Sequence, residues 1–237
     1  MVASTHPAPP TPALSVPRLL FHSAVAGTMV QAYVSLQALT AELRAQAGVV
    51  EEYGGQYQFL TILGLLITIS TFALSALRDV LPLHFLHQAK RVFALAALPV
   101  EITISAIYWP LILAAPSLML PPKLDAEPAV DGAPPALFWI PLWMDLGLHA
   151  VPAVSLIIDF FFLEKKYRPP TSTRTATLLA AGLGTAYALW AEHCNKQNGH
   201  FAYPFLDVMD GPARAATYAG ATGFALLVFR GLNALHQ

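Results

Sequence analysis

Six long stretches of this 237-residue chain contain no Asp, Glu, Lys or Arg. A bilayer core of ~30 Å needs about 20 mostly apolar residues in a helix, and the stretches 19–41, 53–77 and 102–122 reach that length alone. The stretches 146–158, 175–191 and 215–229 reach it only if a flanking charge enters the span. Because backbone groups in lipid must pair within their own segment, these spans have to be helices.

The pattern therefore predicts an all-α, polytopic membrane protein with a bundle of six transmembrane helices. We expect the helices at about 18–40, 57–78, 92–120, 138–163, 174–194 and 213–233. Composition agrees, since 11% of the residues are charged against about a quarter in soluble domains. The net charge of −1 provides no basic field, so we expect no nucleic-acid partner. The single cysteine, Cys194, excludes an internal disulfide and a thiolate metal site.

Proline and the basic residues predict how the chain is organised around these spans. Residues 1–17 hold five prolines and no Lys or Arg. This composition predicts a disordered tail and no signal peptide. The remainder, 18–237, is expected to be one transmembrane domain. The amino-terminal tail, two alternate connections and the carboxyl terminus hold nine of the 13 basic residues. Lys and Arg mark the cytosolic side, so both termini are predicted to face the cytosol.

Polar residues at membrane depth mark the interior of the bundle. In the second span, hydroxyl and small residues recur every three or four positions, on one helix face: Thr61, Gly64, Thr68, Thr71 and Ser75. Such a stripe is typical of a close-packing seam between membrane helices, and this is the simpler interpretation. In the fourth span, Asp145 and His149 are four residues apart and share a face. The histidine is either structural or catalytic.

Depth estimates bring one hydroxyl and this imidazole into the same leaflet. Thr61 lies about four residues inside the second span, or ~6 Å deep. His149 lies six residues beyond Trp143, whose indole suits the membrane interface, or ~9 Å deep. Both spans enter from the non-cytosolic face, so the two side chains are expected within reach of each other. A threonine beside a base is a known nucleophile arrangement.

Three segments, in this order and spacing, resemble a family of six-span membrane proteins. Residues 53–61 read Tyr-Gly-Gly-Gln-Tyr-Gln-Phe-Leu-Thr, and residues 143–149 read Trp-Met-Asp-Leu-Gly-Leu-His. Residues 187–190 read Tyr-Ala-Leu-Trp, and Tyr-Pro-Phe-Leu follows at 203–206. Over about residues 53–220 the chain is similar to the androgen-induced and androgen-dependent TFPI-regulating proteins, and it looks like a fungal member of that family.

The resemblance implies an activity and two site residues. Members of this family hydrolyse fatty acid esters of hydroxy fatty acids with a threonine nucleophile and a histidine. These roles fall on Thr61 and His149. Where family members carry asparagine, this chain has Asp145, a carboxylate that either orients His149 or bonds a neighbouring helix. The reaction needs no cofactor or metal, and its partners are the lipid bilayer and the lipid ester.

An oxyanion donor is also needed for this chemistry. Gln58, Tyr108 and Tyr203 are the candidates, and the sequence does not choose among them. Two other functions stay open: a non-catalytic lipid-binding protein and a small-molecule transporter. The absence of an internal repeat weighs against the transporter. Span length does not separate the endoplasmic reticulum from the plasma membrane.

Overall fold

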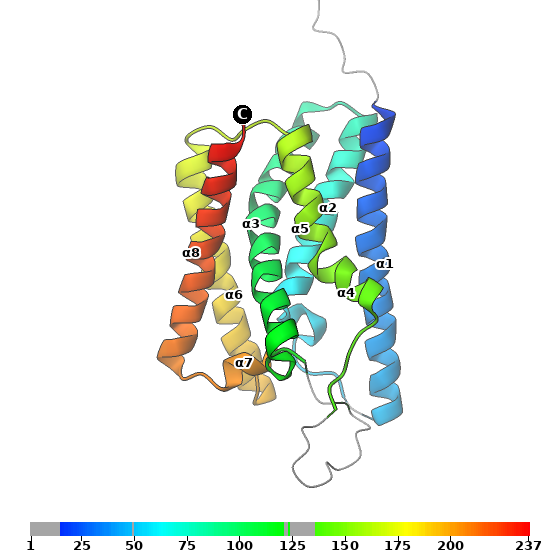
Figure 1. The fold of residues 1–237 in the computed structure, drawn as a ribbon, viewed down its shortest axis with the longest axis vertical. Helices are drawn as coiled ribbons and strands as arrows, with labels where there is room; N and C mark the ends of the chain where they lie inside the picture. The colour runs from blue at the N-terminus through cyan, green and yellow to red at the C-terminus, as the bar shows by residue number, and fades with distance from the viewer. Residues whose placement is uncertain (1–14, 49, 121–122, 124–135) are drawn as a thin grey trace, which may run out of the picture.

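The computed structural model describes residues 15–48, 50–120, 123 and 136–237, and every secondary-structure element in these ranges is a helix. The predicted tail lies outside them except for its last three residues: Ser15 is the N-cap of the first helix, and Val16 and Pro17 begin it. The main helices run roughly parallel (Figure 1). Their bounds are α1 Val16–Ala47, α2 Leu60–Val80, α3 His84–Ala114, α4 Leu142–His149, α5 Val151–Ile158, α6 Ala176–Asn198, α7 Pro204–Asp207 and α8 Gly211–Leu235. Short 3₁₀ and π turns lie between them: η1 Gly55–Gln58, η2 Pro116–Leu118, η3 Asp159–Leu163 and η4 Thr171–Thr175.

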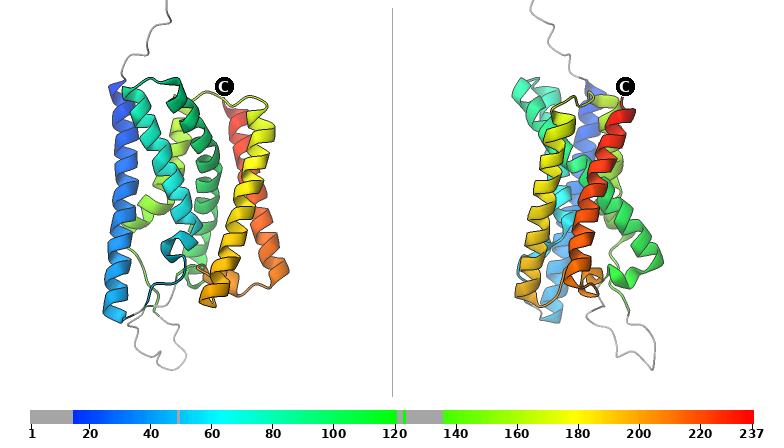
Figure 2. Two further views of the ribbon diagram at one scale, coloured as in Figure 1. Left: turned by 180° about the vertical axis from the view of Figure 1, so that it is seen from behind. Right: turned by 90° about the vertical axis from the view of Figure 1, so that its left-hand side faces the viewer.

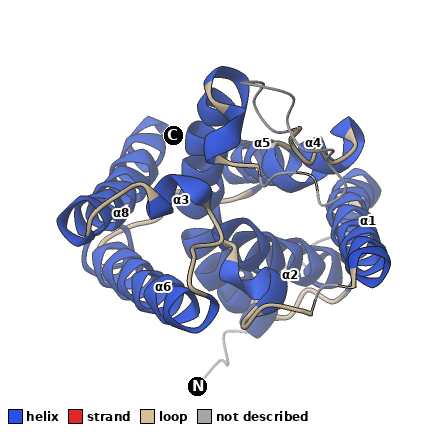
Figure 3. Ribbon diagram, turned by 90° about the horizontal axis from the view of Figure 1, so that it is seen from below, coloured by secondary structure: helices blue, strands red, loops and turns tan. Residues whose placement is uncertain are grey.

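Two groups of helices make up the bundle. Helices α1 to α5 pack closely together, whereas α6 and α8 lie side by side along the length of the molecule (Figure 2). Viewed along the bundle, α3 lies between this pair and the helices α2 and α5 (Figure 3). We call the end where α1 begins and α8 ends the termini end, and the opposite end the far end.

The helices confirm an all-α, polytopic membrane protein. Four of them, α1, α2, α3 and α8, are long and apolar enough to cross a bilayer, and α4 with the segment Val151–Leu163 forms a fifth candidate that bends by 44°. Helix α6 has 23 residues but is more polar than these candidates. A helix thus lies at each of the six predicted positions, while the count of six spans and the cytosolic termini stay predictions.

The bend between α4 and α5 has a local cause. Pro152 lies at the start of α5 and has no N–H to donate to the preceding turn. The α-helix is interrupted at Ala150, and α5 begins again at Val151. The predicted span 138–163 is therefore broken directly after His149, so the histidine ends a helix instead of lying inside one.

Two helices extend beyond their predicted ends. Helix α1 continues to Ala47, and α3 starts at His84 although the prediction began it at residue 92. The earlier start is possible because Lys90, which looks like a loop residue in the sequence, is fully buried and paired with Asp159 and Glu164 at 2.6 Å each. The two carboxylates replace the hydration that the Lys90 ammonium group would have in water.

This pairing belongs to a buried ion network at the termini end. The imidazole of His22 lies between Asp79, at 2.6 Å, and Asp159, at 3.0 Å. Asp159 and Glu164 share Lys90, and Arg91 lies 2.9 Å from Glu164. These six residues define the network, which joins α1, α2 and α3 to the segment after α5. Asp159 is thus a buried ion-pair residue.

The polar stripe of α2 faces the interior, as predicted. Its residues are all buried, with Thr68 and Thr71 fully so. The hydroxyls of Thr68, Thr71 and Ser75 donate to the carbonyls four residues earlier. This is the packing-seam interpretation for the inner part of the stripe. Thr61, in the first turn, differs from the others because its hydroxyl bonds outside its own helix.

Candidate active site

His149 ends α4 and is held by the carboxylate one turn before it. The distance from His149 Nδ1 to Asp145 Oδ1 is 2.7 Å, and both residues are buried. A carboxylate on Nδ1 fixes the imidazole orientation and directs the other ring nitrogen, Nε2, away from it. Nε2 makes no hydrogen bond within the described part of the chain. The arrangement has the form of the histidine and acid of a catalytic triad.

Tyr108 of α3 completes this cluster. Its ring stacks on the imidazole of His149, with centroids 3.5 Å apart and planes within 3° of parallel. Its hydroxyl donates to the same Asp145 Oδ1 at 2.7 Å. The carboxylate therefore accepts from two residues, and the imidazole is fixed both in its plane and along its edge.

The break after α4 also positions the histidine backbone. The carbonyl of His149 accepts hydrogen bonds from the Ser105 hydroxyl and from Trp109 Nε1, the latter at 3.3 Å. Both donors lie on α3, next to Tyr108. The sequence does not indicate a role for these two residues. Nothing in the local pattern of α3 shows that the helix break after His149 will leave a backbone carbonyl facing α3.

Thr61 lies in the first turn of α2, where helical N–H groups have no carbonyl to bond. The Tyr203 hydroxyl lies 3.4 Å from both the Thr61 backbone nitrogen and Oγ1. Tyr203 packs edge-to-face on Phe59, with ring centroids 5.4 Å apart. Burial raises the pKa of the Tyr203 phenol above its ordinary value, so this hydroxyl keeps its proton at neutral pH.

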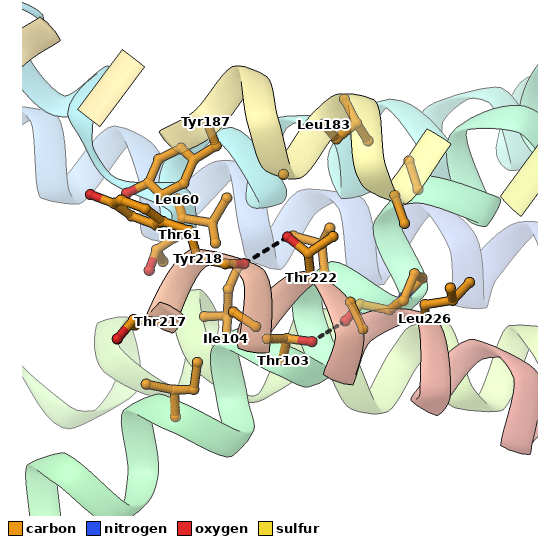
Figure 4. Close-up of a pocket in the computed structure, with 18 of the residues that line it drawn as sticks. Leu60, Thr61, Thr103, Ile104, Leu183, Tyr187, Thr217, Tyr218, Thr222 and Leu226 are labelled. Atoms are coloured by element: carbon orange, nitrogen blue, oxygen red, sulfur yellow. Dashed lines mark hydrogen bonds between the residues drawn. The ribbon is translucent and has the colours of Figure 1, made fainter. Parts of the chain in front are cut away.

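A cavity of about 160 Å³ connects these groups. Thr61, Tyr203 and Tyr108 all line it, together with mostly apolar residues of α3, α6 and α8. Figure 4 shows Thr61, Tyr187 and Tyr218 gathered at one end of the cavity, and Leu183 and Leu226 further along it. His149 is not among the lining residues, but Tyr108 touches it and forms part of the cavity wall.

Gln58 is directed elsewhere. Its Nε2 donates to Glu52 at 3.2 Å and to the Gly55 carbonyl at 3.0 Å, and its Oε1 accepts from Asn198. It does not line the cavity. These bonds fix the loop before α2, so of the three predicted oxyanion donors only Tyr108 and Tyr203 reach the cavity. The Tyr108 hydroxyl already donates its proton to Asp145. Tyr203 is therefore the remaining candidate for an oxyanion donor.

The structure thus forms two half-sites at the far end of the bundle. One holds Asp145, His149 and Tyr108, and the other holds Thr61 and Tyr203. Within the described residues no hydrogen bond joins Thr61 to His149, and the shared cavity wall is what connects the halves. In the same ranges there is also no group of three or more His, Cys, Asp or Glu side chains placed to hold a metal ion.

Two known proteins are similar to this chain over about three quarters of its length. A UPF0641 membrane protein of Schizosaccharomyces pombe is 25% identical over 186 residues, which cover 78% of this chain and 76% of the relative. The human androgen-induced gene 1 protein is 26% identical over 187 residues, covering 73% of this chain and 72% of the relative. No solved structure matches the chain.

The family model described as FAR-17a/AIG1-like protein matches residues 18–237, from the third residue of α1 to the last residue of the chain. This match confirms the resemblance found in the three sequence segments. The chain belongs to the FAR-17a/AIG1-like family of integral membrane proteins.

Proposed function

We propose that this protein is an intramembrane ester hydrolase with Thr61 as nucleophile and His149 as base. One observation carries the proposal: Asp145 holds the imidazole through Nδ1, and among the described residues Nε2 has no hydrogen-bond partner, next to the wall of the cavity that Thr61 lines. A buried, oriented imidazole is what a secondary hydroxyl needs in order to attack a carbonyl. Closure of the two half-sites around the substrate would bring Nε2 to the Thr61 hydroxyl, since catalytic hydrogen bonds often tighten only when substrate is bound.

The reaction proceeds in two balanced steps. His149 Nε2 takes the Thr61 proton while Oγ1 attacks the ester carbonyl, and the C–O bond to the alcohol breaks. The alcohol leaves with the proton held by His149, and the acyl group stays on Thr61. His149 then takes a proton from water, and the resulting hydroxide attacks the carbonyl of the acyl-threonine. The bond from this carbonyl carbon to Thr61 Oγ1 breaks, Oγ1 takes the proton back from His149, and the acid is released. Asp145 stabilises the imidazolium in both steps.

Tyr203 and the backbone of Thr61 are the oxyanion donors in this mechanism. The negative oxygen formed by attack at Thr61 lies close to the nucleophile, and the Tyr203 hydroxyl is within 3.4 Å of both Thr61 Oγ1 and the Thr61 nitrogen. The Thr61 N–H, in the first turn of α2, is at the positive end of the helix dipole. Donors fixed in a site that excludes water lower the barrier more than donors in water do.

The substrate class in this proposal is a lipid ester, specifically a fatty acid ester of a hydroxy fatty acid. The resemblance of the residue segments suggests this class, and the apolar cavity supports a long-chain ester. A substrate with two acyl chains partitions into the bilayer, because each buried methylene is stabilised by ~0.8 kcal/mol. Thr61 and His149 are expected a few residues inside their spans, at a depth where the ester group of such a lipid lies, near the membrane surface.

The test is hydrolysis in detergent micelles by the purified protein. A fatty acid ester of a hydroxy fatty acid is compared with a triglyceride for wild type, Thr61→Ala and His149→Ala, each checked for monodisperse folding. Thr28→Val is the matched control, because the Thr28 hydroxyl donates to the Ala24 carbonyl of its own helix and Thr28 is an exposed residue that does not line the cavity. We expect turnover of the branched ester by wild type and Thr28→Val, and none by the other two.

The other two functions give different results in this assay. A lipid-binding protein would bind the ester without cleaving it, and a transporter would move it into vesicles intact. Turnover that survives in Thr61→Ala would show that water or another residue attacks, and would contradict the mechanism.

A further inference from the structure

The cavity that begins at Thr61 continues along α3 and α8 toward the termini end. Its lining on α3 runs from Tyr108 back to Leu95, thirteen positions along the helix and thus ~20 Å. On α8 it runs from Thr217 to Phe229, which is ~18 Å. The cavity is therefore long, and its axis lies along the bundle.

The polar groups of this cavity are concentrated at the far end. Thr61 and Tyr187 are there (Figure 4), and the Tyr203 hydroxyl lies 3.4 Å from Thr61 Oγ1. Further in, the hydroxyls of Thr103 and Thr222 donate to carbonyls of their own helices, at 2.7 and 2.8 Å (Figure 4). These threonines need no partner from a ligand, so the inner part of the cavity suits a ligand without polar groups.

The termini end of the cavity is closed. Phe229 and Leu95 line it there and are 1% and 4% exposed. The ring of Tyr167 packs edge-to-face on Phe229, with centroids 5.7 Å apart, and the guanidinium of Arg91 lies 4.0 Å above the Tyr167 ring. Arg91 is in turn part of the buried ion network. Behind Phe229 the cavity thus meets a packed and charged layer.

Small side chains form the wall between α6 and α8. The lining includes Ala180 of α6 and Ala221 and Ala225 of α8. These residues leave space along the cavity that larger side chains would fill. Gly184 of α6 also lines it and lets the Thr222 side chain lie directly against the α6 backbone. The result is a channel with one polar end, one closed apolar end and a length of ~20 Å, somewhat more than one leaflet of the ~30 Å hydrocarbon core.

We propose that this channel holds one unbranched acyl chain, the chain on the carbonyl side of the ester, with its terminal methyl toward Phe229. The inference rests on the proposed function, because Thr61 at the polar end places the carbonyl there. The acyl chain of a membrane lipid is about as long as one leaflet is thick, and the channel has a similar length. Its polar carbonyl would lie at the polar end of the channel and its apolar tail along the apolar part. Phe229 and Ala225 then determine the longest acyl chain that is hydrolysed, while the hydroxy acid leaves from the far end.

Two substitutions test the channel length. Ala225→Phe fills the channel one turn, or ~6 Å, before its end, and Phe229→Ala extends it. The substrates are esters with one fixed hydroxy acid and acyl chains of increasing length. We expect Ala225→Phe to lower the ratio of kcat/KM for long over short acyl chains by roughly tenfold, and Phe229→Ala to move the preferred length upward.

Matched controls lie on the same helix. Ala216→Phe and Phe224→Ala change exposed positions of α8 that do not line the cavity, and both should keep the wild-type length profile. An unchanged long-to-short ratio in Ala225→Phe, in an enzyme that still cleaves the ester, would overturn the channel and leave the proposed function intact. The channel would also be overturned if Ala225→Phe changed kcat/KM with the length of the hydroxy acid but not with the length of the acyl chain.

A binding measurement separates the channel from catalysis. A fatty acid with a photoreactive diazirine near its methyl end is crosslinked to Thr61→Ala protein, and the labelled peptides are mapped. We expect label on α3 near Leu95 and on α8 near Phe229, and loss of that label in the Thr61→Ala, Ala225→Phe double variant. This label without any ester cleavage by wild type would support the channel and contradict the proposed function, whereas label only on lipid-facing residues would overturn the channel.

Discussion

Asp145 accepts hydrogen bonds from His149 and Tyr108 at the same oxygen, at 2.7 Å each. In the proposed mechanism its negative charge matters only when His149 becomes positive, in the transition state. A neutral amide at this position keeps an acceptor for Nδ1 but loses that charge. The chemistry of this one residue therefore sets the rate more than it sets substrate binding.

We predict that Asp145→Ala lowers kcat by ~10²-fold or more and that Asp145→Asn lowers it less, both with little change in KM. The measurement is steady-state hydrolysis in micelles, with thermal unfolding as the check on folding. Equal kcat in wild type and Asp145→Ala would remove Asp145 from the mechanism and leave it a purely structural partner of α3.

A second prediction concerns Tyr203, the donor next to Thr61. Tyr203→Phe keeps the ring that packs on Phe59 but removes the hydroxyl, and we expect kcat to fall by ~10²–10³-fold, as for loss of one oxyanion donor. Tyr53→Phe is the control, because the Tyr53 hydroxyl contacts His193 near the molecular surface and not the cavity. A Tyr203→Phe enzyme with the wild-type rate would place the oxyanion elsewhere.

How far the site was predictable depends on the separation of its residues in sequence. The contact of Asp145 with His149 follows from four-residue spacing on one helix face, and it is present. The contacts of Tyr203 with Thr61 and of Tyr108 with Asp145 join residues 142 and 37 positions apart. Helix spacing cannot determine those, because they depend on how separate helices pack. Gln58 shows the reverse, since its position one turn before Thr61 suggested a role that its bonds to the preceding loop prevent.

At the scale of the helix, the packing of α2 against α3 depends on one glycine. A Cβ on Gly64 would lie 2.9 Å from Ile104 Cδ1 and 3.0 Å from Glu101 Oε1. The Glu101 side chain is fully buried, and its Oε1 lies 3.0 Å from Thr68 Oγ1. Small residues at such a position let two membrane helices approach closely.

We predict that Gly64→Val destabilises the folded protein by ~1–3 kcal/mol, the usual cost of overpacking a core. The matched control is Gly27→Val on α1, where an added Cβ meets nothing within 4 Å. Thermal unfolding of both variants in detergent is the measurement. A Gly64→Val protein as stable as Gly27→Val would mean that α2 and α3 can separate without loss.

Helix boundaries illustrate what hydropathy can and cannot predict. The six predicted positions each contain a helix, because long charge-free stretches have few other solutions in lipid. The start of α3 was placed eight residues late, since a lysine at position 90 reads as a loop until its carboxylate partners are known. The break after His149 was missed for a similar reason: Pro152 can kink a helix or interrupt it, and packing decides between the two.

At the scale of the whole molecule, the ion network ties the helices together at the termini end. Burial raises the pKa of Glu164, but the charge of Lys90 and its hydrogen bond outweigh burial, so the pKa of this carboxyl lies below its ordinary value. A group with a lowered pKa in the folded state stabilises the fold above its unfolded pKa, ~4.3 for glutamate. That stabilisation is lost as the pH falls through the folded-state pKa.

We therefore predict that the unfolding temperature in micelles is steady near neutral pH and falls once the pH drops below ~4.3. Glu164→Gln should be less stable at neutral pH and should lose less stability on acidification than wild type. The measurement is thermal unfolding of both proteins across this pH range. Parallel curves for the two proteins would show that Glu164 is not the group that titrates.

The central claim of this account is that Thr61 forms a covalent acyl intermediate with the help of His149. Its most direct test is a reactive phosphonate ester of a long-chain lipid, incubated with the detergent-purified protein and located by mass spectrometry of the peptides. We predict one adduct, on Thr61, that is absent from Thr61→Ala, strongly reduced in His149→Ala and unchanged in Thr28→Val, whose substitution lies outside the cavity. An adduct on another residue, or ester hydrolysis at the wild-type rate by Thr61→Ala, would contradict it.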